Sequence, residues 1–465
     1  MPQTASYQRQ GADKIMIVSY LSLVVIGWLM LYSTVYDDKN PYAFLDINTP
    51  IGAQSAWLLI SLLAFVMVLQ LDWKFWNGIA FPFYAVTIAL LILVLLGGKV
   101  INGSKSWFSF GPLSFQPSEW AKFGTALALS GFLSFNKSNL TDFKTITTSL
   151  SIIFLPVLLI LMQPDAGSAM VFISMFILLY RRGLSGWIFM IVFILIAVFI
   201  ISLVFSPVTV IMLIMGAGVF IYGLEHLEVK NNILLMSGLS AVTIFLLWQK
   251  EYLFSVIPFT SAFVIYTANT FYRKKFRLPA TLVPAAIFFI GIGYLSEFAI
   301  DKVLRPHQQD RINVWLRPEK CDPRGSLYNI IQSKLAIGSG GFTGKGYLGG
   351  EMTKLNYVPE QSTDFIFTSI AEEQGFLGSL GVIMIFTILV IRCISIAEKT
   401  RLEFIRNFAY CVGGIIFFHY AINLGMTMGL VPVVGIPLPF ISKGGSSLLA
   451  FSVMIATVIK MGQAK

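Results

Sequence analysis

One carboxylate in this sequence lies among cations in a polar, turn-forming segment. Asp322 precedes Pro323, and Arg317, Lys320 and Arg324 flank the pair. A carboxylate in this setting can act as a general base on a sugar hydroxyl, while the cations neutralise a diphosphate leaving group. An Asp-Pro turn in a solvated loop accounts for the same residues without any chemistry. The local sequence allows both interpretations of Asp322.

Charged residues beside apolar stretches give a second set of candidates. Glu119 and Lys122 are three residues apart and therefore share one face of a helix. Because ionisable side chains at membrane depth are costly, such a pair indicates either a binding site or an intrahelical ion pair. Asp165 follows Pro164 and precedes an apolar stretch, which is typical of a helix N-cap. Capping alone is the favoured role of Asp165.

Two further segments carry polar or small residues just before apolar stretches. Glu360 and Asp364 lead into one stretch, where Asp364 can simply stabilise the positive end of a helix. Residues 437–447, rich in proline, glycine and serine, interrupt the helical pattern before the last stretch. Small residues there either let helices approach closely or line a cavity with backbone amides. Neither interpretation identifies a reaction.

The elements that position these residues must lie in a membrane. Of the 465 residues, 56% are hydrophobic and 12% charged, and the mean hydropathy of +0.77 is far from that of a soluble domain. The net charge of +10 would suggest nucleic acid for a soluble protein. Many of the cations lie in short segments between apolar stretches, so we assign the charge to membrane topology and expect no nucleic acid partner. Three widely spaced histidines and three cysteines give no metal motif and no disulfide framework.

Apolar runs long enough to cross a bilayer predict about fourteen transmembrane helices. The first run has no small-residue cleavage site after it, so we expect an uncleaved helix there. The predicted spans are residues 14–34, 53–71, 77–97, 119–135, 147–163, 166–180, 186–205, 207–224, 232–249, 254–272, 278–297, 363–391, 405–427 and 444–460.

The positions of the cations predict that the N-terminus and the C-terminus are both cytoplasmic. With the N-terminus inside, Arg181, Arg182 and the basic residues of 273–277 and 392–406 also lie inside. The same alternation places four segments outside, namely residues 98–118, 163–165, 298–362 and 428–443. All of the candidate residues above lie on or near that outer side.

Residues 298–362 form the only long polar segment of the chain. Loops of this length are usually functional or disordered, and the aromatic residues in this one indicate that it packs. It holds nine Lys or Arg against six Asp or Glu, on the side where cations are normally scarce. An anionic ligand would account for that excess.

Several segments together resemble the motifs of the SEDS family of cell-shape, division and sporulation proteins, in the family's order. The similarity is greatest to the rod-shape members and covers most of the chain outside roughly residues 185–300. The segments that carry it are residues 116–122, 163–167, 322–333, 338–346, 359–367 and 431–447.

The resemblance implies a peptidoglycan glycosyltransferase that polymerises lipid II on the outer side of the inner membrane. It further implies a partner, a class B penicillin-binding protein that cross-links the strands. By this analogy Asp322 deprotonates the acceptor 4-hydroxyl, which attacks the anomeric carbon of the donor and expels undecaprenyl diphosphate. No metal site and no definite cofactor are implied, and a divalent cation at the diphosphate is left open.

The resemblance also extends the set of expected substrate-binding residues. Arg311 and Lys345 are the candidates for holding phosphate, Arg as a fork and Lys as a point charge. The full expected set is Glu119, Lys122, Asp165, Arg311, Gln332, Lys345, Glu360, Asp364, Ser442, Gly444, Gly445 and Ser446.

The sequence departs from the family pattern in two places. The family usually has ten spans in its helix bundle, whereas four additional helices are predicted here; because their number is even, the catalytic loop stays outside. Leu327 replaces a glycine that is common beside the catalytic aspartate. The expected regions are N-terminal helices with family motifs (1–184), additional helices (185–297), an extracytoplasmic catalytic loop (298–362) and C-terminal helices (363–465).

Three other functions fit parts of the sequence. A lipid II flippase also needs many spans and buried charges, but it predicts charges at the bilayer midplane, and those found here gather at the outer helix ends. A non-catalytic scaffold for the penicillin-binding partner would need the helices without Asp322. A polymerase of the division septum, from the same family, would share the site and differ in its cellular role.

Overall fold

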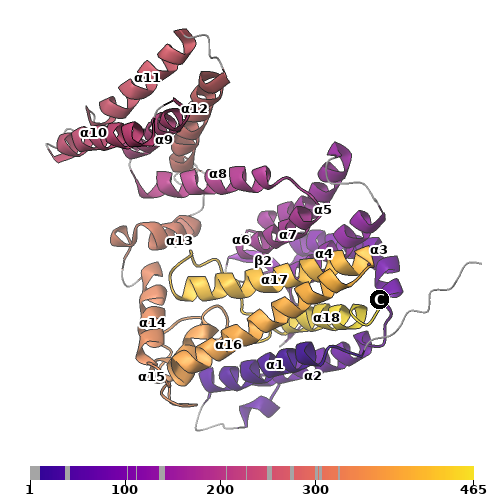
Figure 1. Cartoon of the computed structure of the whole chain (residues 1–465). Helices are drawn as coiled ribbons and strands as arrows, with labels where there is room; N and C mark the ends of the chain where they lie inside the picture. The colour runs from indigo at the N-terminus through magenta and orange to yellow at the C-terminus, as the bar shows by residue number, and fades with distance from the viewer. Residues whose placement is uncertain are drawn as a thin grey trace, which may run out of the picture. The chain divides into compact units, whose positions relative to one another are not determined.

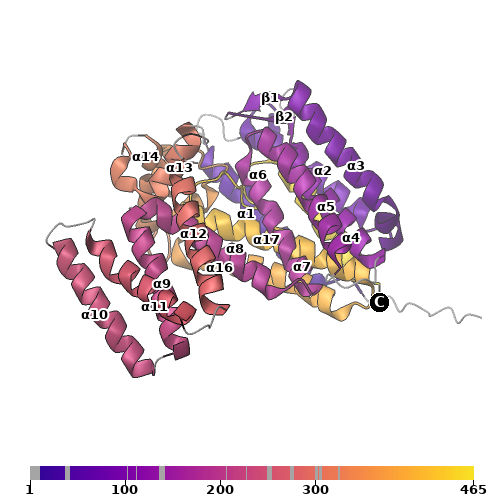
Figure 2. The same cartoon turned by 90° about the horizontal axis from the view of Figure 1, so that it is seen from above.

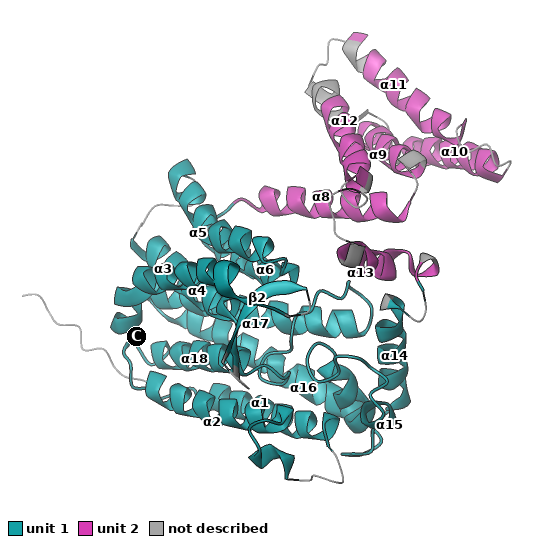
Figure 3. Cartoon of the chain, turned by 180° about the vertical axis from the view of Figure 1, so that it is seen from behind, with its two compact units in different colours: residues 1–184, 322–465 teal, residues 185–321 magenta. Residues whose placement is uncertain are grey.

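The computed structural model describes most of the chain. The described residues are 11–36, 42–101, 103–110, 113–135, 142–205, 207–226, 228–248, 254–272, 277–298, 302, 306–322 and 325–464. The chain divides into two compact units, one of residues 1–184 and 322–465 and the other of residues 185–321, and Figure 3 colours them separately.

The first unit is a bundle of helices with one small sheet (Figure 1). Its α-helices are α1 (Lys14–Thr34), α2 (Pro50–Val68), α3 (Trp73–Gly97), α4 (Pro117–Phe135), α5 (Phe143–Met162), α6 (Ala166–Met170), α7 (Phe176–Arg181), α14 (Ser326–Ser339), α15 (Glu351–Lys354), α16 (Ile366–Lys399), α17 (Glu403–Thr427) and α18 (Gly445–Met461). Short 3₁₀ turns, η1 (Ala43–Leu45) and η2 (Val171–Met175), join some of them.

The sheet is an antiparallel meander between α3 and α4 that the sequence did not predict. Its strands are β1 (Lys99–Ile101), β2 (Ser104–Phe110) and β3 (Leu113–Phe115), in that order. Figure 2 shows β1 and β2 beside one end of α3. The sheet lies within the segment 98–118, which was expected only to be outside the membrane.

The core of this unit is built around α4, α17 and α18. Phe123, Phe408 and Phe451, one from each of these helices, are fully buried. In the most apolar 18-residue stretch of α17, 72% of the residues are buried, against 22% in the corresponding stretch of α3. Helix α17 is therefore central, and α3 turns most of its apolar side chains outward. Apolar side chains that would be unfavourable in water are accommodated when lipid is the solvent.

The second unit is a smaller set of apolar helices. It contains α8 (Gly186–Val204), α9 (Pro207–His226), α10 (Val229–Trp248), η3 (Phe254–Val256), α11 (Ile257–Tyr272), α12 (Arg277–Phe298), α13 (Pro306–Leu316) and η5 (Pro318–Lys320). Val219, Phe263 and Ala286 form its core, where α9 meets α11 and α12. The unit extends past residue 297 and includes the first part of the segment expected to form the outer loop.

A helix is present in each of the fourteen predicted spans. Within the described residues, eight helices are long and apolar enough to cross a membrane, and five further apolar helices are shorter. The chain is therefore a multi-pass, all-α membrane protein apart from its small sheet, while the number fourteen remains a prediction. The described part of residues 298–362 is largely helical, through α13, α14 and α15.

Candidate functional site

Segments that are far apart in the sequence meet at one end of the first unit. The backbone N–H of Gln116 donates to Ser446 Oγ at 3.2 Å, and the Gln116 side-chain amide donates to Asp165 Oδ2 at 3.0 Å. Ser168 donates to both carboxylate oxygens of Asp165, from its backbone N–H at 3.0 Å and its hydroxyl at 2.8 Å. The starts of α4, α6 and α18 are thereby joined, and Asp165 is the N-cap of α6, as its sequence setting indicated.

Glu119 and Lys122 form a buried ion pair on α4. Lys122 Nζ lies 2.8 Å from Glu119 Oε1, and the two side chains are 0% and 2% exposed. Lys122 Nζ also lies 3.0 Å from Nε2 of His419 on α17, and His419 Nδ1 lies 3.1 Å from the carbonyl of Pro437. With Nδ1 as the donor to that carbonyl, the neutral ring accepts from the Lys122 ammonium through Nε2.

The irregular segment between α17 and α18 is held from α17. Asn423, one turn after His419, donates through Nδ2 to the carbonyls of Ile436 at 2.8 Å and Asp364 at 2.9 Å. Non-helical backbone at membrane depth needs such partners because lipid offers none. One face of α17 therefore fixes both this segment and the residues before α16.

A close backbone approach adds to this arrangement. A Cβ atom at Gly167 would lie 2.4 Å from the carbonyl oxygen of Val434, so only glycine fits against that segment. Nearby, Ser442 Oγ donates to the carbonyl of Thr363 at 2.6 Å and accepts from the N–H of Leu438 at 2.8 Å. The chain before α16 and the chain before α18 are consequently fastened to each other.

The remaining predicted residues of this region occupy its edges. Gly444 donates its N–H to Gln54 Oε1 at 3.2 Å, and the ring of Trp57 lies against Gly445. Glu360 is exposed, has a positive φ of 57°, and accepts from the hydroxyl of Thr363 at 2.9 Å. Asp364 is half-buried directly before α16.

Lys345 lies in a second cluster, around a break in α16. Its ammonium pairs with Glu372 at 2.9 Å, and the other Glu372 oxygen accepts from the N–H and hydroxyl of Thr353 at 2.9 and 2.7 Å. Gly375 has a φ of 64°, which interrupts the helix. The glycine-rich segment before α15 supplies a hydrogen-bond acceptor at this break, because Phe376 donates its N–H to the carbonyl of Gly341 at 2.9 Å.

Asp322 is exposed and stands just ahead of α14, at the boundary between the two units. Its carbonyl accepts from the N–H of Gly325 at 3.0 Å, as in a turn. Pro323 and Arg324 lie outside the described residues. Gln332 is half-buried on α14, whereas Arg311 is exposed on α13 in the second unit. The roles expected for these residues therefore stay predictions.

Two groups outside the membrane-spanning helices have raised pKa values. Burial raises the pKa of the Tyr347 hydroxyl to about 12, helped by the charge of Glu373. Burial also raises the pKa of the Cys321 thiol, and Asp310 and Glu319 act in the same direction. Neither shift brings its group closer to exchanging a proton near neutral pH.

Sequence reasoning assigned no role in this region to His419, Asn423 or Glu372. Each lies within a predicted span, where a polar residue is unusual enough to mark a buried interaction. That signal could have singled them out, although it names no partner. Among the described residues, no cluster of three or more His, Cys, Asp or Glu side chains is placed to hold a metal ion, and the divalent cation remains an open alternative.

Comparisons with known proteins extend over nearly the whole chain. The family model of FtsW, RodA and SpoVE, described as cell cycle protein, matches residues 13–217 and 206–465. Peptidoglycan glycosyltransferase RodA of Treponema pallidum is 31% identical over 97% of this chain and 96% of its own length. Peptidoglycan glycosyltransferase MrdB of Escherichia coli is 29% identical, over 94% of this chain and 90% of its own.

Solved structures show the same fold. A chain from a peptidoglycan synthase complex that coordinates polymerization and crosslinking is 26% identical over 97% of this chain and 98% of its own, with a TM-score of 0.62. The rod shape determining protein RodA of Thermus thermophilus is 22% identical over 99% of this chain and 98% of its own, with a TM-score of 0.54, and it supports the fold alone.

Proposed function

This chain belongs to the FtsW, RodA and SpoVE family of cell cycle proteins, and we propose that it is a peptidoglycan glycosyltransferase that polymerises lipid II for cell elongation and rod shape. The observation that carries the proposal is its 31% identity to an enzyme of that name across nearly the full length of both chains. The arrangement of the motif segments around one end of the first unit agrees with it.

The proposed chemistry centres on Asp322. Its exposed carboxylate takes the proton of the acceptor 4-hydroxyl, the resulting oxygen attacks the anomeric carbon of the donor, and the bond to the diphosphate breaks. Undecaprenyl diphosphate leaves with the electron pair of that bond. Arg317 is close to Asp322 in the chain, and a guanidinium there can offset the charge that develops on the leaving group.

The other predicted site residues of the first unit have three kinds of role in this proposal. Glu119 and Lys122 bond to each other and Asp165 bonds to neighbouring groups within the bundle, so we assign them to the floor of the site. Lys345, paired with Glu372, lies beside the glycine-rich segment and contributes a cation toward the diphosphate. Gln332, Glu360, Asp364, Ser442, Gly444, Gly445 and Ser446 complete the proposed substrate-binding surface.

The protein is proposed to lie in the inner membrane with both termini in the cytoplasm. The support is the set of basic residues at the ends of α7, α16 and α18 that the positive-inside rule places there. The partner we propose is a class B penicillin-binding protein, because the solved relative belongs to a complex that coordinates polymerization and crosslinking.

The decisive experiment supplies the purified protein and its partner with labelled lipid II and measures glycan chains. Asp322→Asn should lower the rate at least about 100-fold, the lower range for loss of a general base. Glu319→Gln is the matched control, since it removes an exposed carboxylate from the same segment and should leave the rate close to wild type.

Other outcomes separate the competing functions. Equal polymer from wild type and Asp322→Asn would remove Asp322 from the base role. If neither wild type nor Asp322→Asn makes polymer but lipid II still moves across vesicle membranes, the protein is a flippase and not a polymerase. Rescue of septum formation rather than rod shape in depleted cells would assign the enzyme to division.

A further inference from the structure

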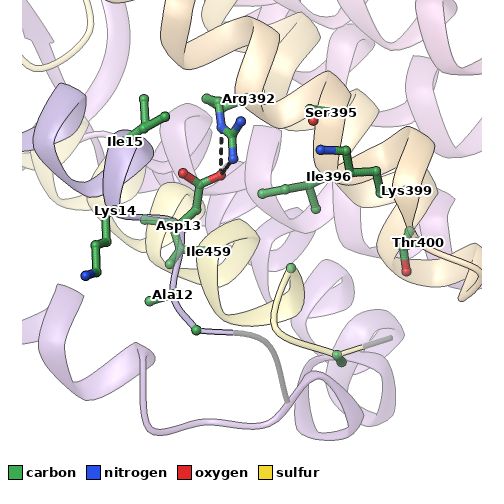
Figure 4. A pocket seen from close by; sticks show the side chains of 13 residues that line it. Ala12, Asp13, Lys14, Ile15, Arg392, Ser395, Ile396, Lys399, Thr400 and Ile459 are labelled. Carbon is green, nitrogen blue, oxygen red and sulfur yellow. Dashed lines mark hydrogen bonds and ion pairs between the residues drawn. The ribbon is translucent and has the colours of Figure 1, made fainter. Parts of the chain in front are cut away.

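A cavity of about 350 Å³ lies in the first unit (Figure 4). It is formed by the start of α1 and the last turns of α16 and α18. The candidate site borders the opposite ends of α16 and α18, and α16 alone, with 34 residues, is roughly 50 Å long. The cavity is therefore separate from the proposed reaction.

Among the described residues that line this cavity, Asp13 is the one carboxylate, and it is already neutralised. Asp13 Oδ2 accepts from Arg392 Nε at 2.8 Å and from Nη2 at 2.5 Å, and Figure 4 shows both bonds. The other oxygen, Oδ1, accepts from the N–H of Met16 at 3.1 Å and caps α1. This pair fixes the start of α1 against α16 and leaves no free negative charge on the wall.

Two exposed cations also line the cavity, from different helices. Lys14 begins α1 and Lys399 ends α16, and neither forms an ion pair with any residue in the described part of the chain. Lys14, Lys399, Arg392 and Asp13 together give the lining a formal charge of +2, from three cations and one anion. Ser395 lies on the same face of α16 as Arg392 and Lys399, three and four residues from them, and adds a hydroxyl.

Apolar side chains make up part of the remaining wall, and the apolar surface continues along α1. Ile15, Ile396 and Ile459 line the cavity beside the polar groups. Ile15 is 53% exposed, and Val18, three residues further along the same face of α1, is 62% exposed. A cationic recess beside an outward apolar surface matches an amphiphile with an anionic head better than it matches a soluble anion.

We propose that this cavity binds the phosphate headgroup of an anionic phospholipid, in the leaflet that the sequence predicts to be cytoplasmic. Lys14 and Lys399 are the proposed phosphate ligands, while Arg392 is held in place by Asp13. Lysines near a membrane surface attract anionic lipids, and the cavity is within the roughly 300–1,000 Å³ typical of small-ligand sites. A soluble phosphate ester would offer the same head chemistry without the acyl chains.

A plainer explanation of the two lysines exists and must be tested against this one. Lys399 stabilises the carbonyl end of α16, and cations at this end also set membrane orientation. Neither effect requires a cavity or a bound phosphate. Lys460 shares both effects, since it lies on the last turn of α18, yet it does not line the cavity, which makes it the matched control.

The experiment measures binding of labelled phosphatidylglycerol to the purified full-length protein in detergent. The double variant Lys14→Gln/Lys399→Gln should weaken binding about 30-fold, which corresponds to ~2 kcal/mol at about 1 kcal/mol per lysine. Lys460→Gln should bind as wild type does, and Lys14→Arg/Lys399→Arg should restore most of the affinity. Thermal denaturation of each variant verifies that it is folded.

Two further probes identify the source of the phosphate. Phosphatidylcholine, whose phosphate carries a compensating cation, should bind weakly, and glycerol 3-phosphate should compete only at far higher concentration. Glycerol 3-phosphate could instead compete at the same concentration as phosphatidylglycerol and lose this effect in Lys14→Gln/Lys399→Gln. That result would keep the phosphate site but assign it a soluble ligand. Equal binding of phosphatidylglycerol by wild type and both glutamine variants would overturn the proposal.

Discussion

Replacing Lys122 with methionine should destabilise the protein far more than removing the whole ion pair. Lys122 is fully buried, and its ammonium donates to Glu119 Oε1 at 2.8 Å. The second oxygen, Oε2, has no hydrogen-bond partner in the described part of the chain. Lys122→Met therefore strands a buried carboxylate, at a cost of about 3–5 kcal/mol. That is a large part of a typical stability of roughly 5–15 kcal/mol.

A double-mutant cycle tests this reasoning. Glu119→Gln/Lys122→Met replaces both charges, so it should recover most of the loss and give a coupling energy of about 2–3 kcal/mol. At about 2 °C per kcal/mol, Lys122→Met alone should lower the Tm by roughly 6–10 °C. A thiol-reactive dye can follow unfolding in a Cys321→Ser background, because Cys393 and Cys411 are fully buried until the bundle opens.

Additive effects of the two substitutions would refute the argument. They would mean that Glu119 finds another partner once Lys122 is gone. A Tm for Lys122→Met within about 2 °C of wild type would have the same meaning. Polymerisation by the double variant, measured separately, then reports whether the charges themselves are needed by substrate.

Three further predictions concern other parts of the first unit and the last residue of the second unit. Gly375→Ala should cost about 2–4 kcal/mol of stability, since φ is positive and a Cβ would lie 2.2 Å from a facing backbone nitrogen. Gly381, which has open space around it, is the control, and Gly381→Ala should be neutral or stabilising. The Tm of each variant measures the difference. Asn423→Ala should cost about 2 kcal/mol and slow polymerisation, because the carbonyl of Ile436 loses its donor; an unchanged rate would contradict the positioning role. Cys321 in spheroplasts should react with a membrane-impermeant maleimide, and the reaction rate should keep rising up to and beyond pH 9 because the pKa of the thiol is raised. If the maleimide added outside does not label Cys321, the predicted topology is reversed.

The parts of this site that sequence could predict are those set by local geometry. Glu119 and Lys122 are three residues apart on a helix, so their contact follows from helical periodicity. Asp165 caps α6 because a short carboxylate before a helix finds its first N–H groups. Each prediction needed only neighbours in the chain.

The parts that sequence could not predict depend on contacts between distant helices. His419 lies 297 residues from Lys122, and no spacing rule joins them. The same is true of Tyr20, which donates to Ser452 at 2.8 Å across 432 residues. The sheet before α4 was also missed, because its strands are short and lie in a segment judged only by its side of the membrane.

The division between buried and exposed charge separates the two kinds of role that these residues can have. Lys122 contacts both Glu119 and His419 out of contact with solvent, so loss of these groups should first lower stability and only then the rate. Asp322 is exposed, so Asp322→Asn should leave the Tm nearly unchanged while lowering the rate at least about 100-fold. A substitution at Asp322 that lowered both the Tm and the rate would show that the carboxylate stabilises the turn before α14 rather than accepting the proton of the substrate.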